Sequence, residues 1–560
     1  MFNRFVTSTD NSPHRRPNLS IQFTSLMWPG EAEKPPSEQA QQWQTDLGLS
    51  DLVRVMCVSS RYHSYIYRSL AQLSTDTSVI AWRQDTLRDF INNPALVKRV
   101  EALLPRLAGM SENNVLMGNR KQNLLIQTGE RLAELEMFVE AVQELHEAIS
   151  STTIYSESLT TLRRNLSDVI EDADFQTLRR QLPHFREPFG QIRSLTIGIN
   201  LDYQLRPDSA VLLAVNNHKL GSSASLLERM IGPSEEDQES TGVAPLNYLP
   251  RQPDLRPYDP FYQDLEKLMT HVAKPIAGEL ARYTRISSQP LRRLEYELAF
   301  YVSAVQLYQR LVLCNVPVCF PQALPQDTRR TEIITLVNVN LCLKSSTGMV
   351  PSDVSLNNEG RIAVLTGPNS GGKTTYIQAV GLAQAMFQAG LFICARDARI
   401  SPTNYILTHF PALETRQQGR LAEEAERLRK VFQHVTPSSL VLLNETFSST
   451  SAGEAVFLAQ DVLGGLRAIG VRAIFATHLV ELVDHLDEIS EQTPGDSNLF
   501  SLVAGIHLDS NGDPVRTFEI TRGKPLGRSY AREIARRHGI SLQQILDSQR
   551  NGSDPADNGH

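Results

Sequence analysis

A glycine-rich loop followed by a lysine is the strongest chemical signal in this sequence. An apolar run at residues 361–365 leads into TGPNSGGKTT, at residues 366–375, and a helical pattern follows. Glycines let the backbone curl tightly and aim N–H groups at a phosphate, and the start of a helix adds a favourable potential. A glycine-rich turn without a ligand is the alternative, which the flanking strand and helix disfavour.

The loop predicts an ATP site with Mg²⁺ as its metal. Lys373 would neutralise the β- and γ-phosphates, and the hydroxyl of Thr374 would serve a phosphate-bound Mg²⁺ ion. The residues expected to bind ATP are Gly367, Pro368, Asn369, Ser370, Gly371, Gly372, Lys373, Thr374 and Thr375.

A carboxylate follows the next strongly apolar run. Residues 439–443 read as a buried parallel strand, and Asn444 and Glu445 come at its end. A carboxylate there can orient or deprotonate the attacking water, while positioning and charge neutralisation accelerate phosphoryl transfer itself. We therefore predict that Glu445 is the catalytic base. The alternative is that Glu445 caps a helix or lies on the surface.

A histidine ends a third apolar run. Residues 473–476 read as a strand, and Thr477 and His478 follow it. Ligands of open α/β sheets bind where the strands end, so the imidazole of His478 can contact the γ-phosphate or hold the attacking water. A lone histidine is more often structural, but this position at the strand end favours a catalytic role.

Two kinds of periodicity indicate which elements position these residues. After about residue 330, apolar strands alternate with helices, which is typical of an α/β domain with a largely parallel sheet. Before it, apolar residues recur at helical spacing, as at Leu132, Leu135 and Phe138, and a long helix is expected from about 291 to 313. Strict alternation between residues 195 and 205, with a second apolar run at 211–215, predicts a β-hairpin.

The expected organisation has four parts. Residues 1–40 form a flexible leader because they lack a sustained period, and residues 41–330 form the helical domain. The β insertion lies at about 191–220 and a flexible connector at about 232–260. The nucleotide-binding domain covers 331–545, and 546–560 is a disordered tail.

Composition limits the remaining possibilities. The 560 residues are 41% hydrophobic and carry a formal net charge of −7, which argues against a protein that coats DNA with general positive charge. The five cysteines lack paired metal-ligand spacing, as expected in a reducing compartment. We find no signal peptide and no apolar run of about 18 residues, so the expected location is cytoplasmic, without a membrane.

The motifs TGPNSGGKTTY, LVLLNETFSSTS and FATHLVEL resemble the ATPase domain of the MutS family over about residues 330–545. Upstream, VPSD at 350–353 and WRQD at 82–85 are similar to family segments. The Ser/Thr-rich segment follows Glu445, whereas transporter-like and chromosome-structuring ATPases carry their signature before the acidic strand. This resemblance implies an α/β P-loop ATPase domain of the ABC type, preceded by a mainly α-helical core and lever domain with a small β insertion.

The resemblance also implies partners. The unit would be a homodimer in which Ser449, Thr450 and Ser451 of one subunit reach the nucleotide of the other. The ligand would be double-stranded or branched DNA, held by an ATP-hydrolysing clamp related to mismatch repair or recombination control. An ATP-driven switch acting on a protein, RNA or ribosomal partner is the alternative.

Three departures from the family pattern carry expectations of their own. Asn444 stands where the family usually has Asp. Beside the hydroxyl of Thr374 it would serve Mg²⁺ through a water molecule and without charge, and turnover would be slow. FSSTS at 447–451 replaces GRGTS, which keeps the hydroxyls but loses the glycines. Nothing among the first residues resembles the mismatch-reading domain, so mismatch recognition of the usual kind is not expected.

Overall fold

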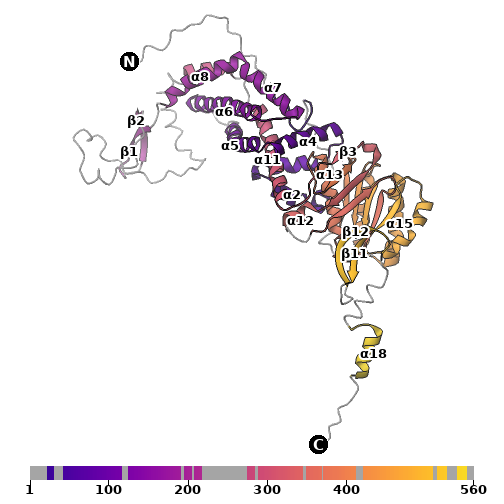
Figure 1. Ribbon diagram of the computed structural model, residues 1–560. Helices are drawn as coiled ribbons and strands as arrows, with labels where there is room; N and C mark the ends of the chain where they lie inside the picture. The colour runs from indigo at the N-terminus through magenta and orange to yellow at the C-terminus, as the bar shows by residue number, and fades with distance from the viewer. Residues whose placement is uncertain are drawn as a thin grey trace. The chain divides into compact units, whose positions relative to one another are not determined.

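The chain divides into two compact units, which are described separately (Figure 1). The first comprises Met1–Phe23, Ala102–Ser151 and Leu162–Glu295, and the second comprises Thr24–Glu101, Thr152–Thr161 and Tyr296–His560. The structure, a computed structural model, describes residues 22–30, 42–115, 124–190, 194–204, 207–216, 274–283, 288–344, 349–368, 370–411, 420–448, 450–508, 514–525 and 539–551.

The first unit is built mainly from helices. Its principal helices are α6 (Leu124–Ser150), α7 (Glu157–Glu171) and α8 (Ala173–Gly190). The apolar positions that recur at helical spacing in α6 are buried, and Phe138 meets Phe175 of α8 edge to face at 6.4 Å between ring centroids. The helical character predicted from the periodicity is therefore confirmed for this part of the chain.

A β-hairpin follows α8, as the alternating pattern predicts. Strands β1 (Ser194–Leu201) and β2 (Pro207–Asn216) pair antiparallel, with two irregularities in their register. Such bulges bend a strand and strengthen its twist. The flexible connector expected at 232–260 lies outside the described residues.

Several helices from before residue 330 belong to the second unit and share a core with its sheets, which corrects the domain boundary expected near residue 330. They are α1 (Gln42–Asp46), α2 (Leu49–Met56), α3 (His63–Ala71), α4 (Thr77–Asn92), the start of α5 (Pro94–Val115) and most of α11 (Gln289–Leu313). Arg83 of α4 is buried and donates to the carbonyl oxygens of Met27 and Gln388. Gly381 lies so close to Leu47 that a Cβ there would come within 2.4 Å of it.

Residues 22–30 also depart from the expected flexible leader. Leu26 and Met27 are buried, and the backbone N–H of Leu26 donates to the Glu297 carboxylate at 2.6 Å. The hydroxyl of Tyr301 donates to the carbonyl oxygen of Leu26 at 2.7 Å. The apolar stretch here is too short to show a period and stands among Pro, Ser and charged residues, so composition alone hides it.

A six-stranded sheet forms the centre of the second unit, with the order β12-β11-β6-β10-β9-β8. Its strands are β6 (Ile362–Thr366), β8 (Ile406–His409), β9 (Leu440–Asn444), β10 (Arg472–Ala476), β11 (Leu499–Leu508) and β12 (Pro514–Arg522). All neighbours pair in parallel except β12, which runs antiparallel to β11. The expectation of a largely parallel α/β sheet is confirmed.

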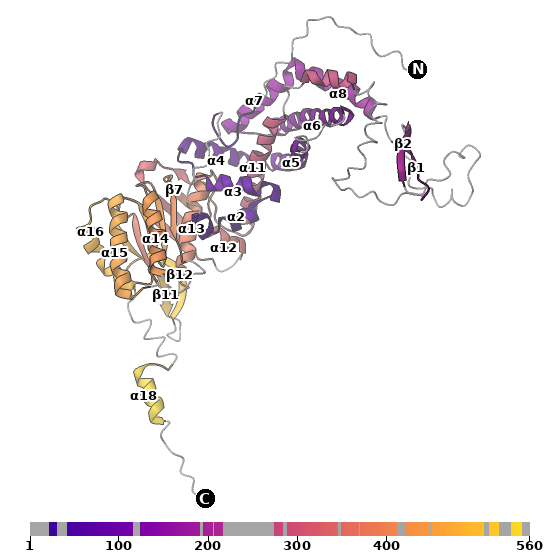
Figure 2. The same cartoon turned by 180° about the vertical axis from the view of Figure 1, so that it is seen from behind.

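Helices cover this sheet on both faces, which explains its continuous apolar strands. On one face, Val441 and Leu443 pack in a core with α14 (Arg420–His434), α15 (Ala452–Ile469) and α16 (Leu486–Gln492). On the other face, Leu442 lies against Gly381 of α13 (Lys373–Gln388). Figure 2 shows α14, α15 and α16 grouped on the side of the sheet away from α13.

A smaller sheet completes the unit, with the order β3-β7-β4-β5. Its strands are β3 (Gln322–Ala323), β4 (Thr331–Leu336), β5 (Ser352–Leu356) and β7 (Asp397–Ile400), and α12 (Val339–Lys344) follows β4. The buried Arg472 of β10 ties the two sheets together, because its guanidinium donates to the hydroxyl of Thr331 and the carbonyl oxygen of Ser401.

The last described helix corrects the expected start of the tail. Helix α18 (Leu542–Asn551) runs through residue 546, where the disordered tail was expected to begin. Leu542, Ile545 and Leu546 follow helical spacing, and their side chains are exposed. In the described part of the chain, no helix combines the length and the apolar character needed to span a bilayer.

Candidate functional site

The three motifs with predicted chemistry meet at one edge of the six-stranded sheet. Strands β6, β10 and β9 are neighbours and run in the same direction, with Leu365 opposite Ala476 and Ala476 opposite Asn444. Their carboxyl ends therefore lie together, which is where ligands of open α/β sheets bind. The glycine-rich loop, Glu445 and the segment leading to His478 all begin at this edge.

The glycine-rich loop has a backbone that requires glycine at two positions. Gly367 and Gly372 have φ angles of +143° and +92°, which side chains other than glycine rarely adopt. A Cβ at Gly367 would also lie 2.7 Å from the Cβ of Ala504. The N–H of Gly371 donates to the carbonyl oxygen of Pro368 at 3.1 Å, and Ser370 is exposed beside it.

Lys373, the first residue of α13, is held within this loop. Its Nζ donates to the carbonyl oxygens of Gly367 and Pro368 at 3.0 and 3.1 Å. Burial lowers the pKa of Lys373 from its ordinary value, and the nearby Glu445 carboxylate opposes that shift. A buried ammonium group bonded to neutral carbonyls is well placed to bind an anion.

The two residues predicted to serve Mg²⁺ are in contact. The hydroxyl of Thr374 donates to the Oδ1 of Asn444 at 3.3 Å. Both groups carry oxygen atoms, the ligand type that Mg²⁺ prefers directly or through water. The next residue, Thr375, accepts a hydrogen bond on its carbonyl oxygen from the Nδ2 of Asn338 at 2.9 Å.

Glu445 stands at a sharp turn after β9. Its φ angle is +49°, an uncommon value for a residue with a side chain, and Phe447 follows at +67°. The N–H of Glu445 donates to the carbonyl oxygen of Ala476 in β10 at 2.8 Å. The half-buried Glu445 side chain reaches the same cavity as Lys373.

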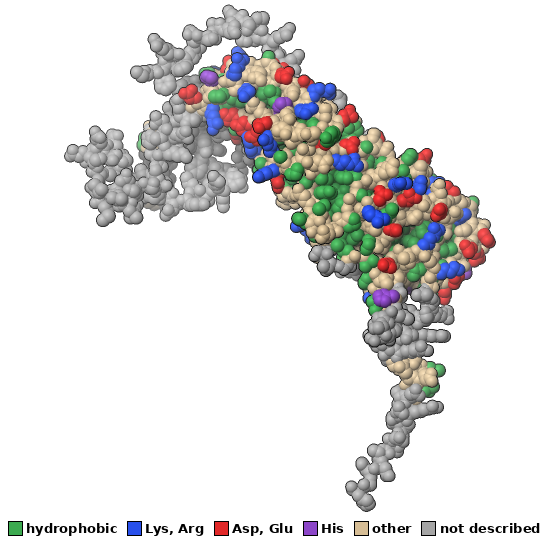
Figure 3. All heavy atoms as spheres, viewed as in Figure 1, with side chains coloured by type: hydrophobic (Ala, Val, Ile, Leu, Met, Phe, Trp, Pro, Cys, Tyr) green, Lys and Arg blue, Asp and Glu red, His purple; other side chains and the backbone are tan. Residues whose placement is uncertain are grey.

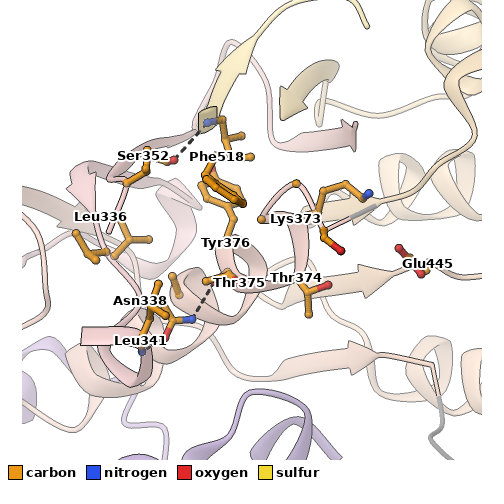
Figure 4. Close-up of a pocket in the computed structure, with 17 residues that line it drawn as sticks. Leu336, Asn338, Leu341, Ser352, Lys373, Thr374, Thr375, Tyr376, Glu445 and Phe518 are labelled. Atoms are coloured by element: carbon orange, nitrogen blue, oxygen red, sulfur yellow. Dashed lines mark hydrogen bonds between the residues drawn. The ribbon is translucent and has the colours of Figure 1, made fainter. Parts of the chain in front are cut away.

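This cavity has a volume of about 460 Å³, within the range of small-molecule sites. Lys373, Thr374 and Glu445 form its polar end, and Figure 4 shows them on the opposite side of the view from Leu336 and Leu341. The full lining consists of Leu336, Val337, Asn338, Leu341, Val350, Ser352, Ser370, Gly371, Gly372, Lys373, Thr374, Thr375, Tyr376, Ala379, Glu445, Phe518 and Ile520. The arrangement suits a molecule with an anionic tail and a flat apolar head.

The sequence motifs identify little of the apolar end of the cavity. Phe518 comes from β12, and a Cβ on Gly372 would touch its ring at 3.5 Å. Asn338 comes from the segment before α12, far from the loop in sequence. Among the sequence motifs, only VPSD at 350–353 points to this end, because Val350 and Ser352 line the cavity. The hydroxyl of Ser352 accepts a hydrogen bond from the backbone N–H of Ile520, another lining residue.

The Ser/Thr-rich segment and His478 lie at a different place on this edge. The hydroxyls of Thr450 and Ser451 both donate to the carboxylate of Glu454 in α15, at 2.7 and 2.8 Å. The exposed His478 lines a second cavity of about 260 Å³ together with Thr450, and does not line the first. Asn369 and Ser449, two further predicted site residues, lie outside the described residues.

Basic and acidic side chains are mixed on the surface that Figure 3 shows. On the described part of the face in Figure 3, Lys and Arg side chains are interspersed with Asp and Glu. The adjacent Arg329 and Arg330 both form ion pairs within the chain, Arg329 with Asp496 and Arg330 with Glu332. These two arginines therefore have a structural role.

Comparisons with known proteins cover both parts of the chain. A family described as the MutS2 N-terminal domain matches residues 75–313, and one described as MutS domain V matches residues 363–549. The first match includes the WRQD segment, and the second includes the glycine-rich loop, Glu445 and His478.

Individual relatives resemble a shorter part of the chain. DNA mismatch repair protein MutS 2 of Halobacterium salinarum is 31% identical over 212 residues, which is 37% of this chain and 23% of the relative. Endonuclease MutS2 of Thermomicrobium roseum is 37% identical over 203 residues, 34% of this chain and 23% of the relative. DNA mismatch repair protein MutS of Myxococcus xanthus is 32% identical over 212 residues, which is 37% of this chain and 23% of the relative.

The chain thus matches 23% of the length of each of these relatives. The two family matches account for the helical part and for the six-stranded sheet with its loop, in the order in which they occur along the chain. Together with the motifs at the sheet edge, they show that this chain belongs to the MutS family.

Proposed function

We propose that the chain binds ATP in the cavity beside the glycine-rich loop and hydrolyses it slowly. The observation that carries this proposal is the grouping of Lys373, Thr374 and Glu445 at the polar end of one cavity. Positive charge, a hydroxyl for the metal and a carboxylate for water are the groups that phosphoryl transfer to water requires. Membership of the MutS family supports the same activity.

Different residues of the cavity have different roles in this proposed reaction. Lys373 and the loop N–H groups bind the phosphates, and Phe518, which lines the cavity beside Gly372, lies against the base. The contacting oxygen atoms of Thr374 and Asn444 fit Mg²⁺, which would offset phosphate charge when bound. Glu445 orients the attacking water and accepts its proton.

Replacing Asn444 by Asp is expected to reduce the Mg²⁺ concentration that gives half-maximal ATP hydrolysis. A charged acceptor forms hydrogen bonds about twice as strong as a neutral one, so a gain of ~1 kcal/mol, roughly fivefold in concentration, is expected. A Mg²⁺ titration of steady-state hydrolysis measures it. Asn444→Ala is the matched control and should shift the titration the other way. An unchanged midpoint in the Asp variant would remove Asn444 from the metal site.

We further propose that each ATP site is completed by a second subunit. Ser451 is exposed at the start of α15, where hydroxyls and N–H groups can meet an anion. In this chain the Thr450 and Ser451 hydroxyls donate to Glu454, and a hydroxyl has only one proton to donate. Contact with a partner's γ-phosphate would therefore exchange the Glu454 bonds for phosphate bonds. His478, beside Thr450, is placed to join them.

Mixing two inactive variants is expected to restore hydrolysis if the sites are shared. Lys373→Ala and Ser451→Arg subunits would each be nearly inactive alone, but a mixed dimer regains one intact site. With random pairing in a two-fold symmetric dimer, roughly a quarter of all sites become intact. Hydrolysis is measured across mixing ratios, and differently tagged subunits establish that mixed dimers form. Mixed dimers without recovered activity would reject the shared site.

We also propose that the dimer acts as a clamp on double-stranded or branched DNA. Family membership supports this, and two relatives are named as DNA mismatch repair proteins. Gel shifts with duplex, branched and RNA ligands over a range of salt concentrations test it, because phosphate contacts make binding weaken steeply with salt. Preferential binding of RNA, or affinity that is insensitive to salt, would count against DNA as the partner.

A further inference from the structure

A buried histidine lies next to the proposed catalytic strand. His409 is the last residue of β8, which pairs in parallel with β9, and its side chain is almost fully buried. Its Nδ1 lies 3.0 Å from the hydroxyl of Thr446, which comes 37 positions later in the chain. Burial, and secondly the charge of Arg427, lower the pKa of His409 to about 4, so the imidazole is neutral near pH 7.

Thr446 belongs to a strained turn. It stands between Glu445 and Phe447, whose φ angles of +49° and +67° are both unusual for residues with side chains. Such backbone persists only where its surroundings hold it, and it is concentrated at functional sites. The β9 ladder ends at Asn444, so the ladder pairing does not fix the turn beyond that point.

Contacts with three neighbouring elements hold the turn in place. The N–H of Glu445 donates to the carbonyl oxygen of Ala476 in β10, and the side chain of Phe447 is buried in the core formed with α15. The third is the bond between the buried Thr446 hydroxyl and His409. His409 belongs to β8, which lies on the opposite side of β9 from Ala476 in β10. The turn is therefore bonded to both strands that neighbour β9.

We propose that His409 is a positioning residue for hydrolysis, which acts on the Glu445 carboxylate through Thr446. This inference rests on the proposed role of Glu445 as the base. A base must be held closely in place, because a displacement of about 1 Å can cost roughly a hundredfold in rate. His409 does not line the cavity of Lys373 and Glu445, so it can affect the direction of the carboxylate without contacting ATP.

Three substitutions of His409 distinguish the contribution of its Nδ1 from that of its Nε2. The amide of Asn stands about where Nδ1 does, and the amide of Gln reaches about as far as Nε2, for which the described residues provide no hydrogen-bond partner. We expect His409→Ala and His409→Gln to lower kcat roughly tenfold to a hundredfold. His409→Asn should recover most of this loss, and the Kd for ATP should stay within about twofold in all three, since the loop is untouched.

Thr446 provides the matched test. Thr446→Val removes the hydroxyl at nearly constant shape and should slow hydrolysis as much as His409→Ala, whereas Thr446→Ser keeps the hydroxyl and the rate. Because the two residues act through one bond, the double variant should be little slower than either single variant. Single-turnover hydrolysis and ATP affinity are measured for each, with thermal melting as the control for folding.

Several outcomes would overturn the proposal. These are rescue by Gln instead of Asn, additive effects in the double variant, or a loss of ATP affinity that parallels the loss of rate. If His409→Ala does not fold, Asn and Thr446→Val still test the same bond. A slow Glu445→Gln with a fast Thr446→Val would reject this inference alone, whereas a fast Glu445→Gln would reject the proposed base itself.

Discussion

Replacing Lys373 by Ala is expected to abolish ATP binding under ordinary assay conditions. The ammonium group is buried in the loop and bonded only to neutral carbonyl oxygens among the described residues, so phosphate would be its charged partner. A hydrogen bond to a charged group contributes about 1.5–3 kcal/mol, and two phosphates share this one. We therefore expect Kd to rise by about a hundredfold or more, measured by titration with a fluorescent ATP analogue.

The control for this variant is the exposed Lys430 of α14. Lys430→Ala removes the same charge from the same unit and should leave ATP affinity unchanged. Thermal melting without nucleotide should also change little in Lys373→Ala, because the substitution removes a buried charge whose desolvation opposes folding. ATP affinity equal to that of the unaltered protein would show that the loop does not hold the phosphates.

Replacing Glu445 by Gln is expected to separate binding from hydrolysis. The amide keeps the shape of the side chain and removes the proton acceptor, a loss that costs about a hundredfold to ten-thousandfold in rate. ATP affinity should not fall, because the substitution removes a negative charge near the phosphate end of the cavity. Equilibrium binding and single-turnover phosphate release, measured on the same sample, give the two quantities.

Glu426 of α14 supplies the comparison for Glu445. It is exposed and paired with Arg429 on the same helix, so Glu426→Gln should alter neither binding nor rate. Hydrolysis at the normal rate in Glu445→Gln would exclude this carboxylate from the chemistry. Weakened ATP binding would instead assign Glu445 to the binding of nucleotide and metal.

Local pattern predicts the polar half of the site. The glycine-rich loop and Glu445 each follow an apolar run in the sequence, and parallel strands carry whatever follows them to the same sheet edge. His478 reaches this edge in the same way but lines the second cavity. The apolar half could not be predicted in this way. Phe518 and Asn338 reach the cavity through β12 and the segment before α12, and nothing in their neighbourhoods marks them as site residues.

In the helical part, too, local pattern does not predict contacts between residues that are far apart in the sequence. Periodicity indicates that a segment is a helix and which side is apolar, but not which core that side enters. It therefore predicts α4 and α11, while the packing of Arg83 against the end of α13 depends on residues about three hundred positions apart. His409 was missed for a related reason, because its partner Thr446 lies in the turn after a later strand.

The burial of residues 25–28 in the second unit has a consequence for how the protein folds during synthesis. The hydroxyl of Ser25 donates to Glu297, which is 272 positions later in the sequence. The entropy of closing so long a loop is lost before the contact contributes, and topologies rich in such contacts fold slowly. The contacts of this segment with Glu297 and Tyr301 must therefore wait until residues 102–295 have been translated, and shielding by chaperones during that interval would favour correct folding over aggregation.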